Sequence, residues 1–115
     1  MSKAILDIDA LHLDFQTEFT FDQSNPNWVR NPDHNTFFLR SMQNLCNDLL
    51  SARGVLFLND VLDQLGISRT QAGQLLGWSR ADGDFVDFQL GQDTADHAVI
   101  IRLDTQHIVL DQLGN

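Results

Sequence analysis

The segment from Gly54 to Arg80 reads GVLFLNDVLDQLGISRTQAGQLLGWSR, and glycines divide it into short units that decide the fold. Apolar residues recur at helical spacing after Asn59, which predicts a short helix that ends at Gly66. So few helical turns are not stable alone in water. We therefore expect this helix to bury its apolar face against elements formed by the flanking segments.

A second short helix is predicted directly after the first. Ser68 is a good N-cap residue, and the apolar residues that follow it end at Gly77. The two helices would form a helical hairpin. Trp78 follows the second glycine stop, and we expect its large ring to be a core residue that joins the hairpin to the C-terminal strands.

The clearest strand lies in the N-terminal part of the chain. Apolar and polar residues alternate from Leu11 to Asp22, which gives the strand one apolar and one polar face. Residues 4–8 are interpreted as a preceding strand or as the beginning of this one. Asp14, Glu18 and Asp22 lie on the polar face, where charges suit an exposed sheet face or a protected sheet edge.

A loop and a long helix follow this strand. Residues 23–35 contain both prolines of the chain and are predicted to form the loop. Trp28 is expected to pin the loop to the body by burying its ring, whereas an exposed Trp28 would be an anchor for a partner. The helix is predicted to run to Arg53 and to be stopped by Gly54. Its candidate N-caps are Asp33, Asn35 and Thr36.

The long helix has one apolar and one polar side, so we expect it to lie across the sheet. The apolar stripe consists of Phe38, Met42, Leu45, Leu49 and Ala52, widened by Leu39, Cys46 and Leu50. The solvent side is marked by Arg40, Gln43, Asn44, Asn47 and Asp48. Cys46 is the only cysteine, which excludes an intrachain disulfide, and it is predicted to be a buried small hydrophobe.

The C-terminal third is predicted to be a three-strand antiparallel meander, with strands at residues 85–90, 98–103 and 107–110. The predicted fold class is therefore α+β, with a single domain over residues 1–115. An antiparallel sheet would carry the long helix and the short helical hairpin on one face. No apolar run has the length of a membrane span, and the N-terminus does not resemble a signal peptide. We expect a cytoplasmic protein without a membrane partner.

Charge is the most unusual property of the sequence. Sixteen acidic residues against seven basic ones give a net charge of −9. One interpretation is solubility, and the other is a surface that occupies a basic, nucleic-acid-binding groove on another protein. For the second interpretation, the candidate partner-binding residues are Asp82, Asp84, Asp87, Asp93 and Asp96, together with Asp14, Glu18 and Asp22 on the N-terminal strand.

The predicted hairpin resembles a helix-turn-helix in outline. The residues that its second helix would present to a DNA major groove are Arg69, Thr70, Gln71 and Gln74. DNA affinity depends on Lys and Arg side chains that neutralise phosphates, and this chain is strongly acidic. We therefore predict no direct binding of nucleic acid by this face.

No metal, cofactor or catalytic site is predicted. The four histidines lack the close spacing of metal ligands, although His97 and His107 could approach each other across the last hairpin, with Asp96 or Asp104 completing a site. The glycines at 66, 73 and 77 punctuate the predicted helices and form no phosphate loop or dinucleotide motif. The four histidines of the chain are His12, His34, His97 and His107. The sequence thus indicates a protein that is not an enzyme.

The run from Asn35 to Trp78 resembles small uncharacterised proteins encoded by phages and mobile elements of Gram-positive bacteria. The resemblance covers rather more than a third of the chain. It is carried by Arg53-Gly54, Leu58-Asn59-Asp60-Val61, Leu65-Gly66 and Gly77-Trp78. Because these are mainly helix stops and core positions, the resemblance implies a biological setting and a fold, and it transfers no binding residue.

The predicted function is that of a non-enzymatic acidic binding protein of phage or mobile-element type. It would inhibit a host nucleic-acid-dependent defence enzyme, in the manner of an anti-CRISPR or anti-restriction protein. The expected partner is a host protein with a basic surface, met in the host cytoplasm, and homo-oligomers are possible. The alternatives are a structural component of a virion or its assembly and a helix-turn-helix transcriptional regulator.

Overall fold

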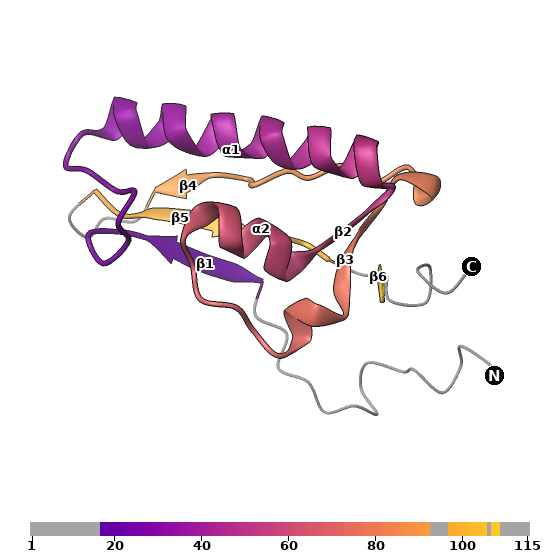
Figure 1. Ribbon diagram of the computed structural model, residues 1–115. Coiled ribbons are helices and arrows are strands. Elements are labelled where there is room, and N and C mark those ends of the chain that lie inside the picture. Colours follow the sequence, from indigo (N-terminus) through magenta and orange to yellow (C-terminus); the bar gives the residue numbers. More distant parts are fainter. Residues whose placement is uncertain (1–16, 93–96, 106, 109–115) are drawn as a thin grey trace.

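A computed structural model describes residues 17–92, 97–105 and 107–108 (Figure 1). The elements in chain order are β1 (Glu18–Phe21), α1 (Pro32–Arg53), β2 (Val55–Phe57), α2 (Leu58–Leu65), β3 (Leu76–Ser79), β4 (Gly91–Gln92), β5 (Val99–Arg102) and β6 (His107–Ile108). Short 3₁₀ turns cover Ala72–Gln74 and Arg80–Asp82. These helices and antiparallel strands confirm the predicted α+β fold class.

Within the described residues, the strands form two antiparallel sheets of three strands each, in the orders β1-β5-β4 and β2-β3-β6. The predicted C-terminal meander is wrong, because β6 pairs with β3 and leaves β5 to pair with β1 and β4. The alternation predicted for residues 11–22 is confirmed for the described residues of β1, whose Phe19 and Phe21 are buried while Glu18 and Thr20 are exposed. Residues 4–16 lie outside the described part of the chain.

The helix α1 begins and ends at residues suited to these positions. Asn31 is its N-cap, and the Asn31 side chain accepts hydrogen bonds from the backbone N–H groups of Asp33 and His34. The predicted caps Asp33, Asn35 and Thr36 are therefore wrong, because Pro32, with its fixed φ, already occupies the first turn. The predicted stop is confirmed, since Gly54 has a left-handed backbone at φ 84° and donates to Leu50 O.

The buried face of α1 is rotated away from the predicted stripe. Leu39, Cys46 and Leu50 are fully buried, whereas Leu45 and Ala52 are exposed. Gln43 and Asn47, both predicted on the solvent side, are half-buried. The reason is a second neighbour on that flank, because the segment that leads to β4 runs beneath α1 (Figure 1).

That segment, residues 84–90, is not assigned to a strand. It is held by helix side chains and by one hydrogen bond from β5, in which Arg102 N donates to Phe88 O at 2.8 Å. The Asn47 amide accepts from Val86 N at 2.7 Å and donates to Val86 O at 2.9 Å, and Gln43 Oε1 accepts from Phe88 N at 2.9 Å. Val86 and Phe88 are fully buried. The predicted strand at 85–90 thus has the expected alternation but is not part of a sheet ladder. Gln89, at φ 47°, then turns the chain into β4.

Residues 76–79 form a buried strand where the sequence predicts the end of a second helix. All four residues of β3 are buried, and they pair with β2 on one side and β6 on the other. At Gly77 the two backbones approach so closely that a Cβ atom would lie 2.0 Å from Leu56 O. Gly77 is therefore a site of close strand packing and not a helix stop, which corrects the predicted hairpin.

Both tryptophans pack against the core as predicted, although the predicted hairpin and meander that Trp78 would join are wrong. Trp78 is 4% exposed and belongs to the main core. Trp28 is half-buried against the same core, its Nε1 donates to His97 O at 3.3 Å, and the Arg30 guanidinium lies 5.5 Å from its ring centroid.

The described helices include none that is both long and apolar enough to cross a bilayer.

Candidate functional site

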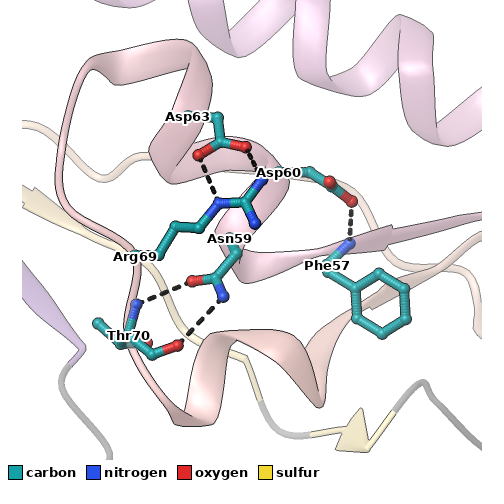
Figure 2. Close-up of polar contacts among 6 residues, drawn as sticks. All are labelled: Phe57, Asn59, Asp60, Asp63, Arg69 and Thr70. Atoms are coloured by element: carbon teal, nitrogen blue, oxygen red, sulfur yellow. Dashed lines mark hydrogen bonds and ion pairs between the residues drawn. The ribbon is translucent and has the colours of Figure 1, made fainter.

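The connection from Gly66 to Gln71 lies between α2 and the first 3₁₀ turn, and side chains of α2 fix its backbone. Gly66 ends α2 with a left-handed backbone at φ 72°. The Asn59 amide accepts from Thr70 N at 2.9 Å and donates to Thr70 O at 3.1 Å, as Figure 2 shows. Because both backbone groups of Thr70 bond to Asn59, the residues around it do not continue a helical hydrogen-bond series. The predicted second helix is reduced to the turn Ala72–Gln74.

Arg69 is directed back onto α2 by a bidentate ion pair. Its Nε and terminal nitrogen lie 2.9 and 2.5 Å from the two Asp63 carboxylate oxygens (Figure 2). The hydrogen bonds from Arg69 lower the pKa of the Asp63 carboxyl. The residues predicted to read DNA, Arg69, Thr70, Gln71 and Gln74, lie on a connection and a 3₁₀ turn, not on a recognition helix.

The other end of α2 carries a second acidic contact. The Asp60 carboxylate accepts from the backbone N–H of Phe57 at 3.0 Å (Figure 2). Burial, with a smaller contribution from the Asp60 charge, raises the pKa of the Cys46 thiol to about 11. The prediction that Cys46 is buried is confirmed, and its thiol is protonated at neutral pH.

A cavity of about 360 Å³ lies between β1 and the connection. We call it the β1 groove, and its lining residues are Phe19, Thr20, Ser24, Asn25, Gly66, Ile67, Ser68, Arg69 and Thr70. Asn25 joins the loop after β1 to the end of α2, because its Nδ2 donates to Leu65 O at 2.8 Å while its Oδ1 accepts from Asn27 N at 2.8 Å. The walls of the groove are thus held by Asn25, Asn59 and Asp63.

The structure places the predicted carboxylates Asp82, Asp84 and Asp87 in one stretch after β3. Asp82 and Asp87 are exposed, whereas Asp84 is half-buried and its Oδ2 accepts from Ser79 N at 2.9 Å. Asp87 accepts from Gln89 N at 3.0 Å in a local turn. Asp84 therefore has a structural role, and Asp82 and Asp87 remain the surface carboxylates of this group. Asp14, Asp93 and Asp96 lie outside the described residues.

Glu18 is the first residue of β1, and Asp22 directly follows the last one; Glu18 precedes the groove-lining residues Phe19 and Thr20 in the chain. Arg102 contacts Glu18 at 3.4 Å and Asp104 at 3.2 Å. Hydrogen bonds from Gln89, and then from Arg102, lower the pKa of Asp104. Two hydrogen bonds from Ser24 lower the pKa of Asp22. With their pKa values lowered, the carboxyl groups of Asp22 and Asp104 are ionised at neutral pH.

The described part of the chain contains no group of three or more His, Cys, Asp or Glu side chains that could hold a metal ion. His34 and His97 are exposed, and His97 has a left-handed backbone at φ 62°. The predicted approach of His97 to His107 depends on the His107 side chain, which lies outside the part of the chain that the structure describes. His12 also lies outside that part. Sequence patterns gave no signal for the β1 groove, because Asn25 and Asn59 look like ordinary turn and capping residues.

A family model described as "Family of unknown function (DUF6353)" matches residues 5–112. No curated protein matches the chain. No solved structure matches it either.

Proposed function

The chain belongs to DUF6353, a family of unknown function, and we propose that it is a non-enzymatic acidic protein that binds a basic surface on another protein. The partner would be a host protein, and the setting would be a phage or mobile element that meets host defences. One observation supports the proposal above all others: four of the six arginines contact neighbouring groups of the same chain, while the carboxylates of Asp82 and Asp87 are exposed at the surface.

The arginines illustrate the first half of this observation. Arg69 bonds to Asp63, and Arg102 to Glu18 and Asp104. Arg80 donates to Ser51 O at the C-terminal end of α1, where a positive charge interacts favourably with the helix dipole. Arg30 covers the Trp28 ring. Of these four cations, Arg69 and Arg102 have their charge compensated by neighbouring carboxylates, which reduces the positive field that they produce at a distance.

The second half concerns Asp82 and Asp87. Both side chains are exposed, and they lie within one short stretch. Carboxylates in such a position can form charge-assisted hydrogen bonds with the Arg and Lys side chains of a phosphate-binding surface. With a net charge of −9, long-range attraction would also speed the encounter and make it sensitive to salt. A nucleic-acid-dependent defence enzyme has a surface of this kind, so we propose inhibition by occupation of its nucleic-acid groove.

The test is affinity capture from host lysate at low and high salt, followed by an activity assay of each captured enzyme. The test variant is Asp82→Asn with Asp87→Asn, since an asparagine at 87 still accepts from Gln89 N. The control variant is Asp33→Asn with Asp48→Asn, which removes the same charge from exposed positions on α1. We expect salt-sensitive capture of a nucleic-acid-binding enzyme, inhibition of that enzyme, and loss of both effects in the test variant only. Equal capture by both variants would contradict this assignment of the surface.

A further inference from the structure

The β1 groove has the geometry of an open sheet edge with a wall opposite to it. Phe19 and Thr20 are consecutive residues of β1, so their side chains point to opposite faces of the sheet. Both line the groove. A cavity that touches both faces of one strand lies at the edge of that strand, and β5 occupies the other edge.

The hydrogen-bond pattern identifies the backbone groups at this edge. Leu103 N donates to Thr17 O at 2.8 Å, and Phe19 stands opposite Ile101 in the register with β5. In an antiparallel pair, residues that bond across the ladder alternate with residues whose N–H and C=O point away. Thr20 therefore directs its N–H and C=O into the groove, and within the described residues neither group has a partner.

The opposite wall also offers backbone donors. The N–H groups of Ser68 and Arg69 make no hydrogen bond to the described part of the protein. The wall keeps its shape because Asn59 holds Thr70 and Asp63 holds Arg69. Preformed walls reduce the entropy that binding would otherwise cost.

We propose that the β1 groove binds an extended basic peptide segment of a partner protein, which adds to β1 as an edge strand. The charges around the groove select the side chains of that segment. Glu18 and Thr20 alternate with the buried Phe19 and Phe21, so they share the outer face of the sheet, and Asp22 adds a carboxylate directly after the strand. On an added strand, residues opposite this face would be Lys or Arg, and the alternate residues, which face Phe19, would be apolar. This inference deepens the proposed function by naming the partner's binding element, and it rests on that function.

The test uses the peptide acetyl-Lys-Val-Lys-Val-Lys-amide and the ¹⁵N-labelled full chain in an NMR titration. We expect shift changes at residues 18–20 and 66–70, and weaker binding by the matching Glu-Val-Glu-Val-Glu peptide. Methylating the backbone nitrogens of either the valines or the lysines blocks one edge of the peptide. At least one of these two peptides should bind about tenfold more weakly, the loss expected from a missing backbone hydrogen bond.

Two protein variants separate the backbone from the side chain. Thr20→Pro removes the N–H that faces the groove and leaves the ladder to β5 intact, because proline is tolerated on an edge whose N–H points outward. It should weaken binding about tenfold, by the same loss of one hydrogen bond, whereas Thr20→Val should bind like the wild type. If Thr20→Pro does not fold, the methylated peptides still decide the question.

Three results would overturn the proposal: no binding at millimolar peptide, equal binding by every methylated peptide, or equal binding by a folded Thr20→Pro variant. Shift changes confined to residues 82–87, and lost in Asp82→Asn with Asp87→Asn, would also reject the groove. That last result would leave the proposed acidic function supported, so the two failures are distinguishable.

Discussion

At the scale of the residue, asparagine amides replace missing backbone partners at three places. Asn35 holds Val29, Asn47 holds Val86 and Asn59 holds Thr70, and each amide accepts from the N–H and donates to the C=O of one residue. An amide that bonds in this way imitates a strand neighbour. Each pair therefore fixes an irregular segment to a helix without a ladder.

Replacing Asn59 by aspartate tests this arrangement. At neutral pH the new carboxylate would face Thr70 O without a proton to donate, so we expect a loss of about 2 kcal/mol in the free energy of unfolding. The folded state favours the protonated carboxyl, which raises its pKa above the unfolded value. The lost stability should therefore return as the pH falls towards about 4, the ordinary pKa of aspartate.

Urea denaturation of Asn59→Asp between pH 7 and pH 4 measures this change. The control is Asn44→Asp, which places the same charge at an exposed position on α1 and should stay within about 0.5 kcal/mol of wild type. If the loss in the free energy of unfolding of Asn59→Asp did not depend on pH, the hydrogen bonds between residue 59 and Thr70 would not be its cause.

Trp78 is a single residue that contributes to the stability of the core. Its ring is almost completely buried among the residues that join the two sheets to the helices. We expect Trp78→Ala to lower the free energy of unfolding by about 3–5 kcal/mol. Phe85→Ala is the matched control, because Phe85 is 66% exposed and its loss should change stability by less than about 0.5 kcal/mol. Equal denaturation midpoints for the two variants would show that Trp78 is not a core residue.

At the scale of the element, the observed N-cap of α1 and the N-cap predicted at Ser68 differ in kind. Asn31 caps α1 with two hydrogen bonds, whereas Ser68 precedes no helix. Asn31→Ala should cost about 0.5–2 kcal/mol, the usual effect of removing an N-cap. Ser68→Ala should change stability by less than about 0.5 kcal/mol. Thermal unfolding of both variants checks the contrast, and a cap-sized loss at Ser68 would support the predicted second helix after all.

The sequence predicts elements well where local chemistry decides them. The stop of α1 at Gly54, the end of α2 at Gly66 and the alternation in β1 all depend on neighbours in the chain. The second helix fails for a non-local reason, because Thr70 bonds to Asn59 and a Cβ at Gly73 would lie 2.1 Å from Asn59 Oδ1.

The same reason explains the other errors in the predicted fold and site. The segment 85–90 has the pattern of a strand, but the amides of Gln43 and Asn47 on α1 bond to its backbone N–H groups, and a single backbone hydrogen bond joins Phe88 O to β5. The β1 groove could not be predicted, since it requires β1 and the connection after α2 to lie side by side. Of the predicted carboxylates, the structure assigns a structural role to Asp84, and no pattern in the sequence distinguishes it from Asp82.

At the scale of the whole molecule, Cys46 reports on the integrity of the fold. Burial raises the pKa of its thiol to about 11 from the ordinary 9.0, so the native protein should not react with a disulfide reagent at pH 8 except through unfolding. The reaction rate should follow the concentration of denaturant in parallel with global unfolding. Because the folded pKa is raised, this thiol also favours folding below about pH 9, and that contribution is lost as the pH rises towards 11. Fast reaction of the native protein in the absence of denaturant would contradict a closed core.

The pairing of β1 with β5 determines when the fold can form during synthesis on the ribosome. Glu18 and its partner Arg102 are 84 residues apart, and β5 is the central strand of its sheet. The nascent chain therefore exposes Phe19 and Phe21 long before Ile101 emerges to cover the same core. Helix α1 can form early from local contacts, but β1 cannot pair until β5 has been synthesised. In a translating cell this aromatic strand is a natural substrate for nascent-chain chaperones.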